Sequence, residues 1–157
     1  MNDLALWQQA NDSALIEHIL SRYHQTHRMQ LGGILPLAEK VAQVHAGSFP
    51  AELLPLLHTM QDELLNHMQK EERVLFPMIL NGAGSGAAMP IRVMMHEHDE
   101  HEHALRQLHS LSNGFTPPPD ACPSWQRLYA ELARLAADLR EHIELENRIL
   151  FARTLAS

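Results

Sequence analysis

The sequence predicts an all-α protein, an antiparallel four-helix bundle, on three observations. Its 157 residues suit a single domain with one sizeable core. Glycine and proline cluster at 45–50, 81–90 and 113–123, where they stop helices or prevent them from starting. Between these breaks, apolar residues recur at alternating steps of three and four, the period of a helix that buries one face. Short connections between four such segments favour antiparallel packing.

Four segments are therefore expected to be helical, at 12–46, 51–80, 88–112 and 124–155. We assign the bundle to residues 12–156 and regard 1–11 as a short lead-in. A kink is expected in the first helix at Gly32, Gly33 and Pro36. The buried face of the second helix is expected to hold Leu53, Leu57, Met60, Leu64, His67, Glu71, Val74 and Met78. The corresponding face of the fourth helix is expected to hold Trp125, Leu128, Leu132, Leu135, Leu139, His142, Glu146 and Ile149.

Composition excludes two classes of partner. The formal charge is -7 and the pI about 5.9, with no basic patch that could release counterions from nucleic acid. No uninterrupted apolar run approaches the roughly 20 residues that cross a membrane. Residues 1–10 lack the features of a secretory signal, and Cys122 is the only cysteine. We therefore expect a cytoplasmic protein that binds neither nucleic acid nor a membrane.

Histidine is unusually abundant, with 12 residues against 12 lysines and arginines together. Imidazole is the commonest metal-ligating side chain, so metal binding is the leading explanation. The alternatives are a set of solvated polar residues or a pH sensor.

A repeated motif places polar groups inside two apolar faces. Residues 67–76 and 142–151 align without a gap, and both read His-x3-Glu-x-Arg-x-Leu-Phe. Residues four apart share a helix face, so the pairs His67/Glu71 and His142/Glu146 can point at one place in the core. A buried carboxylate is costly unless it is paired or bound to metal, and neither face has lysine or arginine in register. The alternative is a buried hydrogen-bonded network between two helices.

The donor types favour iron or manganese. The repeated motif contains no cysteine and so offers no thiolate, and calcium sites do not use histidine. Two bridging carboxylates with two imidazoles per metal would also need one histidine from the first helix, His24 or His27, and one from the third, His98 or His101. An oxo or hydroxo bridge would then leave one open position per metal. On a straight helix at ~1.5 Å per residue, His45 lies ~31 Å from His24, so we expect it near an end of the bundle.

The chain resembles the hemerythrin-like HHE domain, and within it the di-iron iron–sulfur cluster repair proteins, the repair of iron centres family. The matching segments are 22–28, 67–77, 97–99, 116–122 and 142–151. The resemblance implies two non-haem irons, bridged by carboxylates and by an oxo or hydroxo group. By position, it implies the ligands His24, His67, Glu71, His98, His142 and Glu146.

The resemblance also implies a function. It predicts a protein that helps to restore iron–sulfur clusters damaged by nitrosative or oxidative stress, either by supplying iron or by handling nitric oxide. Its partners would be nitric oxide, oxygen and iron–sulfur proteins that accept iron. It is expected to be a metal-binding stress-response protein rather than a dedicated enzyme.

The chain departs from full-length family members, which resemble two-domain proteins with an N-terminal cysteine pair. Only about 11 residues precede the bundle here, and Ala152 stands where the family usually has proline. Two other functions use the same ligand set: a hemerythrin-like binder or sensor of oxygen or nitric oxide, and a di-iron oxidase or peroxide reductase. Binding of metal by His101 alongside His98 would favour the oxygen carrier.

Overall fold

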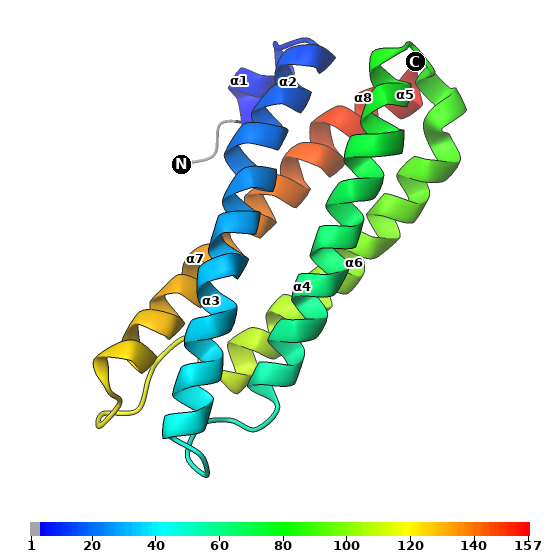
Figure 1. Cartoon of the computed structure of the whole chain (residues 1–157). Helices are drawn as coiled ribbons and strands as arrows, with labels where there is room; N and C mark the ends of the chain where they lie inside the picture. Colours follow the sequence, from blue (N-terminus) through cyan, green and yellow to red (C-terminus); the bar gives the residue numbers. More distant parts are fainter. Residues whose placement is uncertain (1–3) are drawn as a thin grey trace.

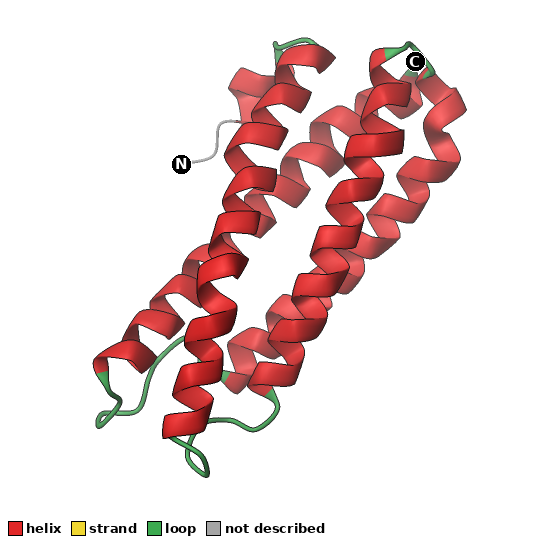
Figure 2. Cartoon of the chain, in the orientation of Figure 1, coloured by secondary structure: helices red, strands yellow, loops and turns green. Residues whose placement is uncertain are grey.

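The computed structural model describes residues 4–157 and is built from long antiparallel helices (Figures 1 and 2). The first arm comprises α2 (Asp12–His18), η1 (Ile19–His24) and α3 (Gln25–Val44), and the second α4 (Leu53–Lys70), η2 (Glu71–Leu75) and α5 (Phe76–Leu80). The third arm is α6 (Ala88–Leu111), and the fourth comprises α7 (Pro123–Leu145), η4 (Glu146–Phe151) and α8 (Ala152–Ala156). Two short helices, α1 (Leu4–Gln8) and η3 (Gly84–Ala87), lie outside these arms. Within residues 4–157 there is no strand, which confirms the all-α bundle.

Local chemistry sets the helix ends. The Asn11 side chain accepts a hydrogen bond of 2.8 Å from the backbone N–H of Ala14 and caps α2. Pro123 occupies the first turn of α7, where its missing N–H costs nothing. Gly114 follows α6 in the left-handed region, with φ of 65°, and its N–H bonds to the carbonyl of His109. No described helix is both long and apolar enough to cross a membrane.

Two apolar clusters fill the bundle, one on each side of a polar layer. One cluster takes residues from 31–68 of the first two arms and from 104–139 of the last two. The other takes residues from 15–23, 75–79, 87–94 and 145–151. The predicted ligands lie where the two clusters meet on each arm, with Met68 of the first cluster next to His67 and Leu145 of the second cluster next to Glu146. The centre therefore lies within the bundle rather than at its end.

Three π-helical turns interrupt the arms, and each includes a predicted ligand. They are η1, which ends at His24, η2, which begins at Glu71, and η4, which begins at Glu146. A π turn adds a residue to the helical repeat and rotates the residues that follow. The prediction that Val74 is buried is wrong for this reason: it is 52% exposed, and Leu75 and Phe76 are buried instead.

The first arm does not break at its glycines. Helix α3 continues through Gly32, Gly33 and Pro36 to Val44. The glycine pair and proline therefore do not end the helix that carries His24 and His27.

Candidate metal centre

The structure brings the six predicted ligands together in the polar layer, and all six side chains are buried. Their donor atoms form two groups, in each of which the atoms lie within 4.8 Å of one another. Glu71 and Glu146 belong to both groups. The first group is completed by His24 and His142, and the second by His67 and His98.

The two carboxylates each reach toward two imidazoles. Glu71 places Oε1 at 3.1 Å from Nε2 of His24 and Oε2 at 3.4 Å from Nε2 of His67. Glu146 likewise serves both groups, with Oε1 at 2.9 Å from Nε2 of His98 and Oε2 at 2.9 Å from Nε2 of His142. One carboxylate oxygen per group is the arrangement of a bridge between two cations.

This arrangement suits metal ions better than a hydrogen-bonded network. Glu71 Oε2 and Glu146 Oε1 are buried without a hydrogen bond among the described residues, although each lies near an imidazole nitrogen. Leaving a buried charged oxygen unpaired costs several kcal/mol or more unless a cation compensates it. Two donor atoms on opposite sides of a metal ion with ~2.1 Å bonds lie ~4.2 Å apart. The donor atoms of each group lie within 4.8 Å of one another, so each group needs only a small contraction to bind a metal ion.

The far nitrogen of every predicted imidazole ligand also has a partner. With Nε2 facing the centre, Nδ1 carries the proton and donates it outward, which fixes the ring orientation. The acceptors are Glu72 for His24 at 2.7 Å, Glu97 for His67 at 2.8 Å, Asn147 for His98 at 2.7 Å and His27 for His142 at 3.1 Å. Arg28 holds Glu72 through two bonds of 2.8 and 2.9 Å, and Lys70 pairs with Glu97.

The partner of His142 begins a chain of hydrogen bonds that leads to the surface. His27 accepts from His142 and donates through Nδ1 to Oε1 of Gln30 at 3.2 Å. Gln30 then donates to Asp138 at 2.8 Å, and Arg22 pairs with the other oxygen of Asp138 at 3.0 Å. From His142 to Asp138, each hydrogen bond is donated away from the metal centre, and Arg22 donates to Asp138 from the opposite side.

The electrostatics of the layer favour positive charge between the carboxylates. Burial lowers the pKa of His67, but Glu71, Glu146 and Glu97 together outweigh burial and raise this pKa to about 9. For His24 as well, burial lowers the pKa and Glu71 raises it, and the resulting pKa is raised. Burial raises the pKa of Glu146, but His98, Glu71 and His67 together outweigh burial and lower this pKa to about 2. Glu146 therefore remains charged and attracts cations.

Two aromatic rings of the repeated motif cover ligands on neighbouring arms. Phe76 lies over His24, with ring centroids 5.7 Å apart and 26° between the planes. Phe151 lies over His98 at 5.9 Å and 8°. Each phenylalanine thus packs against a predicted ligand that belongs to another helix.

The structure also places the histidines that the sequence left open. His27 is buried but lies outside both donor groups, as the acceptor for His142. His101 is buried beside His67 and likewise belongs to neither group. His45 follows Val44, the last residue of α3, and its Nε2 lies 3.2 Å from Sγ of Cys122, so the expectation that it lies near an end of the bundle is confirmed.

Sequence reasoning missed part of the outer layer of the site. Glu72 and Asn147 each follow the glutamate of the motif, and each accepts from a histidine on another arm. The motif alignment could have identified them, because the same position has the same task in both copies. The π turns had a weaker signal: three consecutive apolar residues, 74–76 and 149–151, follow each motif glutamate.

Comparison with known proteins supplies an independent line of evidence. Residues 15–154 match the family described as the hemerythrin HHE cation binding domain. Over 157 residues the chain is 57% identical to the iron-sulfur cluster repair protein DnrN of Neisseria gonorrhoeae, which covers 100% of both chains. It is 49% identical over 152 residues to the iron-sulfur cluster repair protein YtfE of Cronobacter sakazakii, across 96% of this chain and 69% of that one. YtfE of Dickeya chrysanthemi is 47% identical over 151 residues, across 95% of this chain and 68% of that one.

Proposed function

This chain belongs to the hemerythrin HHE cation-binding domain family, and we propose that it is a di-iron protein that repairs stress-damaged iron–sulfur clusters. The observation that carries this proposal is the sharing of Glu71 and Glu146 between two buried donor groups. Its relatives in three bacteria are named iron-sulfur cluster repair proteins, and these names support the proposed role in cluster repair.

The proposed ligands are His24 and His142 for one iron and His67 and His98 for the other, with Glu71 and Glu146 shared. Imidazole and carboxylate donors without thiolate suit iron, and paired carboxylates with histidines are the di-iron ligands of helical bundles. Two bound irons, joined by an oxo or hydroxo bridge, would supply both exchangeable iron and open positions for small molecules.

The chain itself supplies orientation and a route for release. Its outer acceptors hold each imidazole with Nε2 inward, so an iron meets donors that are already aligned. Glu72 and Glu97 are partly exposed and are paired with Arg28 and Lys70 at the protein surface. A ligand histidine backed by such an ion pair can reorient when the pair is disturbed, which would open the donor group to an acceptor protein.

Handling of nitric oxide or oxygen is part of the same proposal. The ligand set would leave room for a diatomic molecule on iron, and both gases would then be partners alongside iron–sulfur proteins. The position of His101 outside both donor groups gives no support to the oxygen-carrier alternative. The single, unpaired cysteine Cys122 agrees with action in a reducing cytoplasm.

The test begins with purified protein reconstituted with iron. We expect two irons per chain and, on addition of an iron–sulfur protein inactivated by nitric oxide, recovery of its cluster absorbance with loss of iron from the donor. Glu146→Ala removes a shared carboxylate and should abolish both iron binding and recovery, whereas His58→Ala, at an exposed histidine, should behave as wild type. Protein that binds no iron, or that binds iron and restores no cluster, contradicts the proposal.

A further inference from the structure

A row of aromatic rings leads from the metal centre toward the protein surface. Tyr23 stacks on the predicted ligand His142, with ring centroids 5.4 Å apart and 17° between the planes. The rings of Tyr23 and His18 meet at 89°, with centroids 5.7 Å apart. His18 in turn stacks on Trp7, at 4.0 Å and 20°. All three separations are those of aromatic rings in direct contact, so the row is continuous.

The row passes from the buried layer of the bundle to its outside. His142 is 1% exposed and Tyr23 6%, whereas His18 and Trp7 are both partly exposed. His18 is the last residue of α2, and Trp7 belongs to α1, the short helix that lies beside α2 (Figure 1). The segment that the sequence marked only as a lead-in therefore supplies the outer end of the row.

The row contains rings that can give up an electron. Tyrosine and tryptophan rings lose a single electron more readily than the other aromatic side chains, and the chain has only two of each. The second pair, Trp125 and Tyr129, belongs to the other apolar cluster. Among the described residues its ring contacts are with His45 and Phe49 and within the pair, so it does not touch a predicted ligand.

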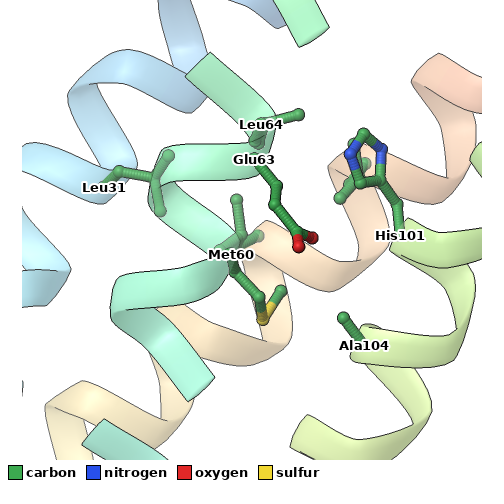
Figure 3. A pocket seen from close by; sticks show the side chains of 8 residues that line it. Leu31, Met60, Glu63, Leu64, His101 and Ala104 are labelled. Atoms are coloured by element: carbon green, nitrogen blue, oxygen red, sulfur yellow. The ribbon is translucent and has the colours of Figure 1, made fainter. Parts of the chain in front are cut away.

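The other three imidazole ligands touch rings of a different kind. Outside the ligand set their ring partners are Phe76 over His24, Phe151 over His98 and His101 beside His67. The side chains around His101 are leucine, methionine and alanine, with the carboxylate of Glu63 (Figure 3). Within the described part of the chain, His142 is thus the one predicted ligand that touches a readily oxidised ring.

Tyr23 also has an acceptor for its proton. A phenol that loses an electron becomes a strong acid, so its proton must leave if no positive charge is to stay in the core. The hydroxyl of Tyr23 donates to Oε2 of Glu141 at 3.4 Å, and Glu141 is partly exposed. The carboxylate can take the proton and return it along the same hydrogen bond.

We propose that Trp7, His18 and Tyr23 form a path for single electrons from the protein surface to the metal centre, and that this path protects His142 from oxidation by peroxide. Bound ferrous iron supplies one of the two electrons that reduce hydrogen peroxide to two hydroxide ions. Tyr23 supplies the second, which is then not taken from the ligand. The inference rests on the proposed function, because it needs iron at His142.

The three side chains return to their starting state after each electron. Tyr23 loses an electron to the peroxide and its hydroxyl proton to Glu141, which leaves a phenoxyl radical. An electron from Trp7 crosses His18 and, with the proton returned by Glu141, restores Tyr23. The oxidised Trp7 releases its N–H proton to water and takes a hydrogen atom from a thiol in solution, which leaves as a thiyl radical.

Transfer between Trp7 and Tyr23 can be measured without metal. Tyr129→Phe removes only a hydroxyl and leaves Tyr23 as the sole tyrosine. In this metal-free full-length protein, azide radicals made by pulse radiolysis oxidise the more accessible tryptophan. We expect the absorbance of the tryptophan radical to decay as that of the phenoxyl radical rises, at a rate independent of protein concentration. Adding Trp7→Phe should abolish the rise.

The bridging ring is tested in the same Tyr129→Phe protein. Adding His18→Leu removes the ring between Trp7 and Tyr23 and should slow the transfer at least tenfold, because electron tunnelling falls steeply with the width of the gap. His18→Phe keeps a ring and should largely restore the rate, and His58→Leu, at an exposed histidine, should leave it unchanged. Absence of the phenoxyl rise, or an equal rate with His18→Leu, overturns the inference.

Protection of the ligand is tested in iron-loaded protein treated with hydrogen peroxide. Tyr23→Phe keeps a ring on His142 but removes the readily lost electron, so a purely structural role would be preserved. We expect several times more oxidised His142 than in the wild type, by peptide mass spectrometry, whereas Tyr129→Phe should match the wild type. Equal oxidation of His142 in wild type and Tyr23→Phe overturns the protective role. If the chain takes up no iron but radical transfer occurs in the metal-free protein, the proposed function fails and the electron path stands.

Discussion

The ring of Phe151 lies nearly parallel to that of His98, with 8° between the planes and 5.9 Å between the centroids. Phe151 comes from the fourth arm and His98 from the third, so the contact ties two helices together at a predicted ligand. Both side chains are buried. The contact gives Phe151 a part in stability and a part in ligand position.

Replacing the Phe151 ring should affect both the stability of the bundle and the position of His98. Phe151→Ala removes a buried aromatic side chain and should lower the free energy of unfolding by ~3–5 kcal/mol, measured by urea denaturation. Phe151→Leu keeps most of the apolar volume and should cost less. We also expect faster loss of iron to a chelator in Phe151→Ala, because His98 gains rotational freedom. Unfolding curves that coincide for the three proteins would show that Phe151 does not carry the packing assigned to it.

His27 offers a test of the hydrogen bond behind a ligand. It accepts the proton of His142 Nδ1 at 3.1 Å, and loss of such a partner typically weakens metal binding ~10–100-fold. His27→Ala should therefore release iron at a lower chelator concentration, in a competition titration, whereas His27→Gln can keep an acceptor and should be affected less. His58→Ala changes an exposed histidine and serves as the control. An iron affinity of His27→Ala equal to the wild type would sink this assignment.

The distinction between His27 and His24 shows where sequence reasoning reaches its limit. Helical spacing put both near the core, and both are fully buried, so pattern alone left either as a ligand. The choice depends on contacts with distant parts of the chain. Glu71 lies 3.1 Å from Nε2 of His24, and Asp138 holds Gln30, which in turn bonds to His27 and helps to orient it toward His142. Periodicity contains no information on such contacts, whereas the family resemblance selected His24.

The bundle itself was predictable because it follows from short-range chemistry. Proline and glycine mark the loops, and the apolar period marks the buried faces, so each arm could be placed within a few residues. The π turns could not be placed in this way. They shift the helical face after Glu71 and Glu146, which is why Val74 is exposed where a regular helix would bury it.

Metal removal should expose how strongly the centre holds the arms together. A ligand that binds only the folded chain, present at 100 times its Kd, adds ~2.7 kcal/mol to the free energy of unfolding. For a protein of this size each kcal/mol moves Tm by ~2–4 °C, so removal of the metal by a chelator should lower Tm by ~5–10 °C. Differential scanning calorimetry with and without chelator measures the shift. Glu71→Ala lacks a shared carboxylate, so its Tm should not respond to chelator. An equal response in wild type and variant would argue against Glu71 as a shared ligand.

Tyr23 gives the chain a predictable response to alkali. Burial, and then the charge of Glu141, raises the pKa of Tyr23 to about 12, and its hydroxyl donates to Glu141 at 3.4 Å. The pKa in the unfolded chain is ~10, so between these values the unfolded state binds fewer protons and stability must fall as pH rises. Denaturation at a series of pH values should show this loss in the wild type and a smaller loss in Tyr23→Phe. Phenolate absorbance in the wild type should show that Tyr23 still holds its proton at pH values where a free tyrosine has lost it. Titration of Tyr23 with the pKa of a free tyrosine would contradict the predicted loss of stability.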